Sequence, residues 1–408
     1  MAATKIVSRL ADKVRSGLPL TRELAVLSIA GFVTTLGIGI LAPTLPLFAR
    51  SFGVGNASTA AVISAFALAR LVCGLLVGRL SNRVGAQRVM LWGLGILAVS
   101  SALAGWSNSY LMLLTMRAIG GVGSAMFSVS GLTLVARHAP ASGRARATGT
   151  YIGALLLGAA FGPAAGIPFA AISVRAPLFG YAVMAGISLA IVYFGLSRKG
   201  SRTSVPSSDQ EAVSLREALR KRSYRAVVGV NFASTWALGV RSSLIPLYMI
   251  ERLHERPELV GVALFSSAAT NVIVLPPSGK LADRNGRRPV LLTGCAIAFI
   301  GLLLIACLPN TVSLFIGLFL FGAGAGIIEP PSGAVLADVS VGKNNMPVAL
   351  YSMAGDMGMI LGPLAMGALV DALSFTWAFT ATAVVMAAAL ALVSRMPSVR
   401  PQQSRQSP

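Results

Sequence analysis

Five ionisable residues lie inside long apolar stretches of the chain, and they are the first candidates for chemistry. They are Arg70, Arg117, Arg241, Glu329 and Asp356. A charge within a membrane span is costly, so each such residue is a functional candidate by default. At a rise of 1.5 Å per residue, Asp356 lies roughly 15 Å and Arg70 roughly 12 Å from the inner ends of their stretches, as assigned below. The two opposite charges therefore lie at similar depths.

The composition excludes most classes of protein in which these residues would be surface charges. Of the 408 residues, 55% are apolar and only 12% are charged, and the mean hydropathy is +0.76. A soluble globular protein carries about 25% charged residues. Such a chain cannot cover a water-facing surface in the usual way, and it is too apolar to be disordered. The composition therefore predicts a polytopic membrane protein.

Twelve apolar stretches are long enough to span a bilayer as helices, which takes about 20 residues each. They lie near 23–49, 57–78, 89–106, 110–136, 146–167, 177–197, 226–250, 259–279, 290–308, 311–337, 346–370 and 376–394. Lipid offers no partner for open backbone groups, and the stretches are too long for the strands of a barrel. We therefore expect twelve transmembrane helices and an all-α fold.

The distribution of lysine and arginine predicts the orientation. With the N-terminus inside, 27 of the 34 basic residues fall on the inner side, 4 on the outer side and 3 within spans. This bias places both termini in the cytoplasm, as is typical of a multi-pass inner-membrane protein. It also accounts for the net charge of +21 without a nucleic-acid partner.

The order of polar and apolar segments divides the chain into two halves. We expect a basic cytoplasmic N-terminal segment at 1–22, a six-helix bundle at 23–197, a cytoplasmic linker at 198–224, a second six-helix bundle at 225–394 and a cytoplasmic tail at 395–408. Within the linker, a short surface helix is expected around 214–222.

The two halves repeat each other when the chain is shifted by 200 or 201 residues. Gly78-Arg-Leu-Ser-Asn-Arg-Val-Gly85 then falls on Gly279-Lys-Leu-Ala-Asp-Arg-Asn-Gly286. Gly158 and the pair Gly162-Pro163 fall on Gly358 and Gly362-Pro363. Parallel six-helix repeats of this kind are typical of secondary transporters that alternate access to a site near the membrane midplane.

On these motifs the chain resembles the major facilitator superfamily over its whole length, and more specifically its 12-helix drug:proton antiporter group. The family's gating motif corresponds to Gly78, Asn82, Arg83, Gly85, Gly279, Asp283, Arg284, Gly286 and Arg287. In its first copy Asn82 replaces the usual acid. The resemblance implies that Asp283 bears more of the latching role at the cytoplasmic gate.

A second motif resembles the helix-five motif of antiporters. Its residues are Gly149, Gly158, Gly162, Pro163 and Gly166, followed by Ile167 where the family has a last glycine. Small residues also let helices approach closely, which explains the glycines without any role in coupling.

The resemblance also implies a role for the charges within the spans. The family fold places helices two and eleven side by side across the halves, so we predict an ion pair between Arg70 and Asp356. A carboxylate without a partner in a low dielectric has a raised pKa, whereas a neighbouring guanidinium lowers it. Separating the pair would therefore couple proton binding to the motion of the halves. The alternative is a static pair that holds the halves together.

Two more residues are candidates for proton coupling. Glu329 is interpreted as a proton site, as a site for a cationic substrate, or as a lone buried acid bonded to Arg241 or to backbone. Arg117 matches the helix-four motif of proton-coupled members. The first helix, however, offers Thr34 and Thr35 where many exporters carry an acid, so the resemblance supplies no carboxylate on the first helix to pair with this arginine.

The family fold lines its cavity with helices one, four, seven and ten, and apolar or aromatic walls suit amphipathic or lipophilic substrates. Each candidate lining residue is equally well explained by packing. The candidates are Phe32, Thr34, Met126, Phe127, Asn231, Trp236 and Arg241.

The sequence therefore predicts an all-α membrane protein of the major facilitator fold, with two six-helix bundles, that exports small lipophilic or amphipathic compounds in exchange for protons. The alternative within transport is uptake or facilitated passage of a metabolite. Three buried arginines would suit an anionic metabolite. A non-transporting receptor or assembly partner is the alternative outside it. We expect a monomer whose partners are lipids, protons and a small-molecule substrate, with no cofactor and no metal. An enzyme is not expected, because His138 and His254 lie near no nucleophile and Cys73, Cys295 and Cys307 show no metal spacing.

Overall fold

The computed structural model describes residues 22–139, 144–196, 215–339 and 346–397. The predicted N-terminal segment, most of the predicted linker and most of the predicted tail lie outside these ranges. Within the linker, the expected short helix is present as α9 (Leu215–Arg220). Its Ala218 is buried beside Tyr224, Leu336 and Leu350, so α9 packs against the ends of the neighbouring helices rather than lying free.

Twelve helices of 20 to 29 residues dominate the described part of the chain. They are α2 (Arg22–Leu41), α4 (Asn56–Val84), α5 (Ala86–Gly105), α6 (Tyr110–His138), α7 (Arg144–Ile172), α8 (Ala176–Gly195), α10 (Arg222–Leu247), α11 (Pro257–Asn285), α12 (Arg287–Cys307), α13 (Thr311–Val339), α14 (Met346–Ala372) and α15 (Phe375–Ser394). Eleven are long and apolar enough to cross a membrane by length and composition, and α10 is not among these eleven. No strand occurs among the described residues.

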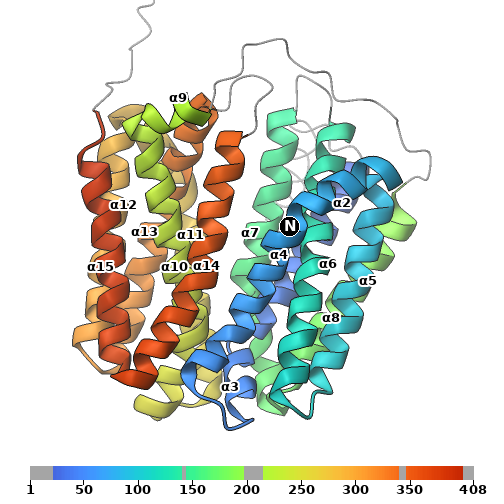
Figure 1. Ribbon diagram of the computed structural model, residues 1–408, viewed down its shortest axis with the longest axis horizontal. Helices are drawn as coiled ribbons and strands as arrows, with labels where there is room; N and C mark the ends of the chain where they lie inside the picture. The colour runs from blue at the N-terminus through green and yellow to red at the C-terminus, as the bar shows by residue number, and fades with distance from the viewer. Residues whose placement is uncertain (1–21, 140–143, 197–214, 340–345, 398–408) are drawn as a thin grey trace, which may run out of the picture.

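Helices α2 to α8 form one bundle and α10 to α15 form the other (Figure 1). We call the face at which α2 begins and α15 ends the terminal face; it is uppermost in Figure 1. The short helix α3 (Leu45–Arg50) lies at the opposite face.

Proline and glycine set the breaks between these elements. The expected single span at 23–49 is wrong in this respect: α2 ends at Leu41, and α3 begins at Leu45 with Pro46 in its first turn. Pro43 and Pro46 lack the N–H groups that an unbroken helix requires. The expected span at 226–250 likewise changes after Pro246 into a five-residue π-helical turn, η2 (Tyr248–Arg252).

Two glycines of the gating motif turn the chain between adjacent helices. Gly85 has φ of 105° between α4 and α5, and Gly286 has φ of 88° between α11 and α12. An L side chain is strained at such angles. The same turn therefore occurs at equivalent positions of the two bundles.

The sequence repeat is also a repeat of contacts. A Cβ atom added to Gly158 would meet the Phe32 carbonyl oxygen at 2.3 Å, and one added to Gly358 would meet that of Phe232 at 2.4 Å. All four positions are related by the 200-residue shift. Backbones approach this closely only where a side chain is missing, so each glycine fixes the same helix pair in its own bundle.

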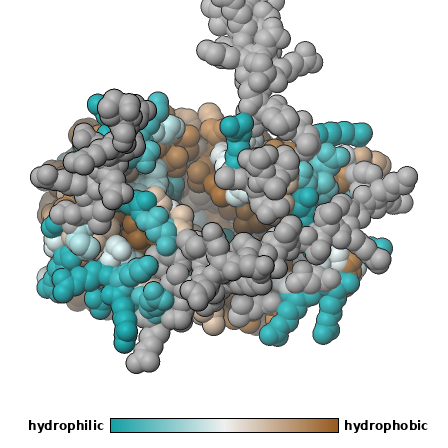
Figure 2. Space-filling view, turned by 90° about the horizontal axis from the view of Figure 1, so that it is seen from above, coloured by the Kyte–Doolittle hydropathy of each residue, from teal (hydrophilic) through white to brown (hydrophobic). Residues whose placement is uncertain are grey.

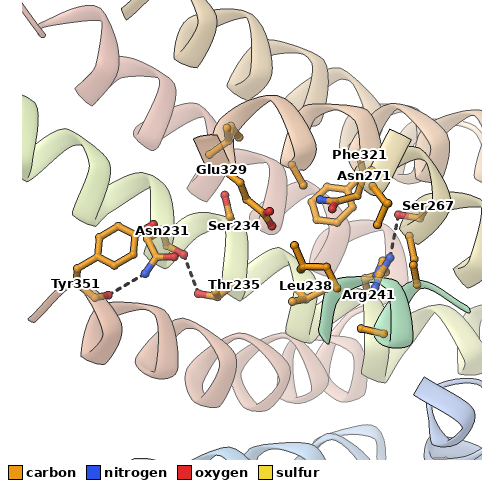
Figure 3. Close-up of a pocket in the computed structure, with 18 residues that line it drawn as sticks. Asn231, Ser234, Thr235, Leu238, Arg241, Ser267, Asn271, Phe321, Glu329 and Tyr351 are labelled. Carbon is orange, nitrogen blue, oxygen red and sulfur yellow. Dashed lines mark hydrogen bonds between the residues drawn. The ribbon is translucent and has the colours of Figure 1, made fainter. Parts of the chain in front are cut away.

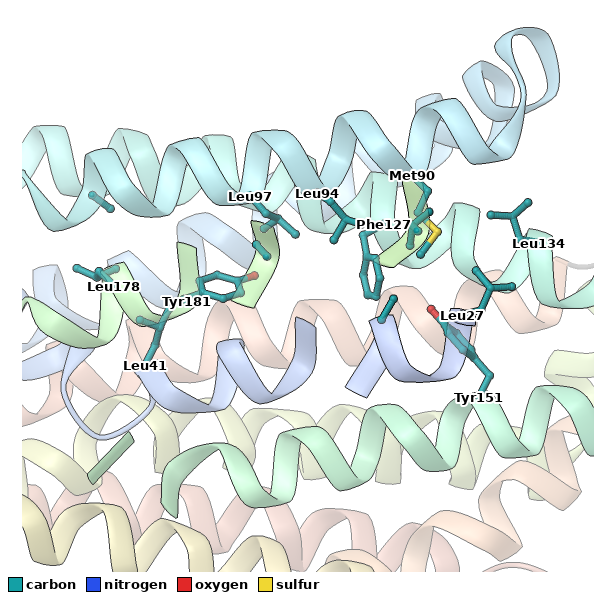
Figure 4. Close-up of a cluster of buried hydrophobic side chains, with 14 of the residues drawn as sticks. Leu27, Leu41, Met90, Leu94, Leu97, Phe127, Leu134, Tyr151, Leu178 and Tyr181 are labelled. Atoms are coloured by element: carbon teal, nitrogen blue, oxygen red, sulfur yellow. The ribbon is translucent and has the colours of Figure 1, made fainter. Parts of the chain in front are cut away.

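Each bundle has its own apolar core. In the first, Leu27, Leu97, Tyr151 and Tyr181 are fully buried and pack with Phe127 (Figure 4). The second core includes Val230, Leu291, Phe321 and Met386. The two cores give each bundle an interior of its own, and the site lies where the bundles meet.

Seen from the terminal face, the molecule has a hollow between the bundles. Figure 2 shows hydrophobic side chains inside this hollow and hydrophilic ones around its rim. Figure 1 shows the bundles meeting near the opposite face. The described residues therefore form a cavity that opens toward the terminal face.

Candidate functional site

The hollow contains a cavity of about 810 Å³ between the two bundles. Helices α4 and α6 contribute one wall, and α10 and α14 contribute the other. Its lining includes Arg70, Ser128, Asn231, Tyr351 and Asp356. The cavity is large enough for a drug-sized molecule, since ligand pockets commonly measure about 300–1,000 Å³.

The predicted pair of opposite charges meets in this cavity. Arg70 Nη2 donates to Asp356 Oδ1 at 2.6 Å, and the bond joins α4 of one bundle to α14 of the other. The side chains are 42% and 20% exposed. Both are therefore accessible from the cavity, and the pair is not sealed inside a core.

A row of polar contacts between α4 and α14 joins the bundles, and we call it the α4–α14 seam. The ion pair between Arg70 and Asp356 forms its end at the cavity. At the opposite face, Asp371 accepts hydrogen bonds from the backbone N–H groups of Asn56 and Ala57 and from the Asn56 side chain, at 2.7–2.8 Å. Between the two ends, Ser64 Oγ donates to the Ile360 carbonyl oxygen at 2.8 Å. From the ion pair toward the terminal face, α4 and α14 line opposite walls of the cavity.

The second contact between the bundles, the α7–α11 seam, is apolar. A Cβ on Gly261 would meet Ile167 Cγ1 at 2.6 Å and the Pro163 carbonyl oxygen at 3.0 Å. The rings of Phe161 and Phe265 lie 5.8 Å apart. Ile167, which replaces the last glycine of the predicted antiporter motif, therefore packs at the interface between the bundles.

A smaller pocket of about 230 Å³ lies beside the α7–α11 seam (Figure 3). Its polar residues come mostly from the second bundle, with Ser234 and Arg241 on α10, Ser267 and Asn271 on α11 and Glu329 on α13. Helix α7 covers it with Leu156, Ala159 and Ala160. The 200-residue shift relates Leu156 to Asp356, and the 201-residue shift relates Arg70 to Asn271. In the repeat of the two halves, this pocket therefore corresponds to the position of the ion pair.

Hydrogen bonds hold most of the polar side chains of this pocket in place. Arg241 Nη1 donates to Ser267 Oγ at 2.9 Å, and Asn271 is the hydrogen-bond partner of Glu329. Asn231 Nδ2 donates to the Tyr351 carbonyl oxygen at 2.8 Å. Of the alternatives considered for Glu329, an ion pair with Arg241 does not occur among the described residues.

Several predicted cavity residues serve packing instead. Thr34 is fully buried and donates to the Ala30 carbonyl oxygen. Met126 and Phe127 are 5% and 3% exposed and belong to the cores of the first bundle. Their helix faces α5 rather than the cavity at these positions, so the prediction for them was wrong.

Phe32 and Trp236, two further cavity candidates, do not line the 810 Å³ cavity, and neither does Arg117, a candidate for proton coupling. Trp236 packs against Phe232 with ring centroids 5.6 Å apart. The backbone carbonyl of Phe32 lies against Gly158 on α7. Arg117 is 6% exposed and its guanidinium lies 4.4 Å from the centroid of the Phe66 ring. It therefore stacks on an aromatic face, and no carboxylate of the described residues pairs with it.

Among the described residues, no ion pair links the predicted gating motif of one bundle to the other bundle. Asp283 is exposed and forms no ion pair among the described residues. Arg287 instead pairs with Asp338 on α13, within its own bundle. The side chain of Asn82 lies outside what the structure describes, so its role stays a prediction. The remaining motif positions lie near the C-terminal ends of α4 and α11; they are Gly78, Arg83, Gly279 and Arg284.

In the second motif, close approach explains most glycines. Gly162 would place a Cβ 2.4 Å from Gly39 Cα, and Gly166 would place one 2.7 Å from the Ile40 carbonyl oxygen. Gly149 has nothing within 4 Å. The motif therefore joins α7 to α2, and its residues contact no charged group of the site.

The structure adds polar residues that the sequence analysis did not single out. They are Ser128, Ser234, Thr235, Ser267, Asn271, Tyr351 and Ser352. A signal was present on α10, where Asn231, Ser234 and Arg241 recur at the spacing of one helical face. A polar stripe on a membrane helix indicates a face turned away from lipid.

Comparison with known proteins identifies the class to which this fold and cavity belong. The family model described as Major Facilitator Superfamily matches residues 27–254 and 227–408. The chain belongs to this superfamily of membrane transporters, so it is a multi-pass membrane protein and not an enzyme, as the sequence predicted.

Particular relatives are distant. The chain is 26% identical over 336 residues to the synaptic vesicular amine transporter of Mus musculus, covering 81% of this chain and 64% of that protein. It therefore spans just under two thirds of that relative's length. It is also 26% identical over 373 residues to multidrug resistance protein 2 of Bacillus subtilis, covering 88% and 92% of the two chains.

The fold also matches solved structures. A bacterial homologue of the human lysosomal transporter spinster superimposes with a TM-score of 0.76 at 14% identity, covering 92% of this chain and 97% of that one. At this level of identity the likeness establishes the shared fold.

Proposed function

We propose that the protein is an inner-membrane secondary transporter that exports small lipophilic or amphipathic compounds in exchange for protons. The observation that carries the proposal is the ion pair between Arg70 and Asp356, which joins the two bundles at the cavity. The relatives named as a multidrug resistance protein and an amine transporter agree with this class of substrate.

The position of the pair supports a coupling role. It lies where the α4–α14 seam ends and the cavity begins, so tilting the bundles changes the distance between the two charges. A carboxylate binds a proton more readily when its cationic partner moves away. Proton binding and bundle motion are then linked, because each state of the protein favours one state of the carboxyl group.

The cavity walls support the proposed class of substrate. Leu71, Val72, Val129, Leu238 and Met359 contribute apolar surface, interrupted by a few hydroxyl and amide groups. Such a wall binds apolar bodies through burial of surface and orients them with a small number of polar contacts.

The proposed orientation places the terminal face in the cytoplasm. The bias of 27 basic residues on that side against 4 on the other is the physical basis, because positively charged loops are retained in the cytoplasm. The cavity described here then opens inward, where an exporter collects its substrate.

The test is flux in proteoliposomes with an imposed proton gradient. One proton moving down 100 mV supplies about 2.3 kcal/mol, which sustains roughly a fifty-fold substrate gradient. We expect Asp356→Asn to lose this gradient-driven accumulation while retaining downhill exchange. Full proton-driven transport by the variant would remove Asp356 from the mechanism.

The matched control is Asp338→Asn, which breaks a carboxylate–arginine pair within one bundle and away from the cavity. It should leave gradient-driven transport within about twofold of the parent, because exposed ion pairs contribute little. The same assay separates the alternatives. Movement that ignores the gradient indicates a facilitator, and no movement across a broad panel of substrates indicates a receptor.

A further inference from the structure

The pocket beside the α7–α11 seam holds two opposite charges that do not pair with each other. Glu329 comes from α13 and Arg241 from α10 (Figure 3). Within the described residues neither takes part in an ion pair. The other two charges at the interface, Arg70 and Asp356, pair with each other. Glu329 and Arg241 are therefore available to a ligand.

The acid lies at the end of the pocket nearer the terminal face. Glu329 is exposed to the pocket, and Figure 3 shows its carboxylate directed inward beside Ser234. Its hydrogen-bond partner is the neutral side chain of Asn271. An ionised carboxylate accepts several hydrogen bonds, so one amide leaves acceptor capacity for a cationic group.

The base lies at the deeper end. Arg241 Nη1 donates to Ser267 Oγ at 2.9 Å, whereas its Nε is buried without a partner. A guanidinium has five N–H donors in a planar fork that matches a carboxylate. A single hydroxyl therefore leaves this group able to bind an anion through two parallel hydrogen bonds.

The distance between the two ends follows from the helices that carry them. Figure 3 shows Ser234 beside Glu329, and Arg241 lies two turns further along α10, which at 1.5 Å per residue is roughly 10 Å. Figure 3 shows Leu238 and Phe321 between the two charges, with the Asn271 side chain beside Phe321. The pocket therefore has a negative end, a largely apolar middle and a positive end.

We propose that this pocket binds dipolar amphipaths, in which an amine and a carboxylate are separated by an apolar body of about 10 Å. The proposal rests on the proposed transport function and names its substrate class. A simple cation would leave Arg241 uncompensated, and a simple anion would leave Glu329 uncompensated. A dipolar ligand compensates both, and a buried charge is costly only while it has no partner.

The experiment uses the purified full-length protein in detergent micelles and three matched probes. The first is a biphenyl with an aminomethyl group at one end and a carboxylate at the other. The second is its methyl ester, which is only a cation, and the third is its N-acetyl derivative, which is only an anion. Thermal stabilisation by each probe reports its affinity, because a ligand bound by the folded state raises Tm.

We expect the dipolar probe to bind at least about tenfold more tightly than either masked probe. Glu329→Gln should remove its advantage over the N-acetyl probe but keep its advantage over the ester. Arg241→Gln should do the reverse, and Arg241→Lys, which keeps the charge, should retain most of the preference for the carboxylate. Elution as a single folded species and an unchanged response to the apolar parent biphenyl control for misfolding.

Equal affinity for all three probes overturns the proposal, and so does tighter binding of either masked probe. A preference that survives both neutral variants also overturns it, because the two charges would then have no part in recognition. Binding in micelles needs no proton gradient. A protein that binds the dipolar probe but does not export it would therefore refute the proposed function while leaving this site intact.

Discussion

At the scale of single residues, the backbone contacts between helices are closer than any side chain permits. A Cβ atom on Gly322 of α13 would lie 2.0 Å from the Ser267 carbonyl oxygen of α11. The obstacle is backbone, which cannot rotate away as a side chain does. The position of Ser267, and with it the hydroxyl that holds Arg241, therefore depends on the absence of a side chain at Gly322.

We expect Gly322→Ala to destabilise the protein by about 1–3 kcal/mol, the usual cost of forcing a methyl group into a packed interface. The control is Gly149→Ala, where nothing lies within 4 Å of the added atom. Alanine favours helix over glycine by about 1 kcal/mol, so the control should be neutral or stabilising. Tm of the two purified variants decides, and a Gly322→Ala variant as stable as its parent would contradict the packing described.

Residue chemistry explains which site residues were predictable. Arg70 and Asp356 stand out because charges are rare inside apolar stretches. Their similar depth, together with the adjacent helices two and eleven of the family that the chain resembles, predicted the pair. Thr34, Met126 and Phe127 have no such signal, since the same side chains suit a cavity wall or a core. Which of these a residue becomes depends on the rotation of its helix, and helices buried on nearly all sides show little amphipathic pattern.

At the scale of elements, the carboxylate of Asp371 caps the beginning of α4 from across the interface. It accepts three hydrogen bonds at the first turn of that helix, where unpaired N–H groups and the helix dipole favour a negative charge. A second link, between Arg50 and Glu251 at 2.8 Å, joins α3 to η2 nearby. Both links exist only while the bundles are closed at this face.

We therefore expect Asp371→Asn to favour the conformation that opens toward the opposite face. Losing the charge at a helix N-terminus costs about 1–2 kcal/mol, which shifts a two-state equilibrium by roughly five- to thirty-fold. Spin labels on cysteines replacing Asn108 and Pro309, in a background without Cys73, Cys295 and Cys307, report the opening as a longer distance. These positions are exposed at that face, one in each bundle.

Glu251→Gln is the matched control for this prediction. It removes a charge from the same face, but its pair with Arg50 is 38% and 30% exposed, and such pairs contribute less than about 1 kcal/mol. A smaller shift than that of Asp371→Asn is expected. If both variants gave the same distance distribution as the parent, the capped helix would not hold this face closed.

Element boundaries were less predictable than the number and order of the spans. The expected spans ended at 78 and 279, whereas α4 and α11 continue to Val84 and Asn285, where Gly85 and Gly286 turn the chain. Hydropathy located the spans but merged α2 with α3, because both are apolar and only Pro43 and Pro46 separate them. Length and hydropathy alone do not register a break that lies within an apolar stretch.

At the scale of the whole molecule, the charge bias makes a prediction about topology. In a background without Cys73, Cys295 and Cys307, cysteines replacing Arg220 and Asn285 lie at the terminal face, and one replacing Asn108 lies at the opposite face. In intact cells a membrane-impermeant maleimide should label only the variant at position 108, because positively charged loops stay in the cytoplasm. Permeabilised cells provide the control, in which all three react. Labelling of positions 220 and 285 in intact cells would invert the orientation.

The unequal seams mean that the two halves are not interchangeable. If each half were paired with a copy of itself, the first would set Arg70 against a leucine, and the second would set Asp356 against an asparagine, by the 200- and 201-residue correspondence. Neither homodimer holds a matched acid and base. Each half therefore supplies one charge of a salt bridge that only two unlike halves can form, and neither half could replace the other without losing it.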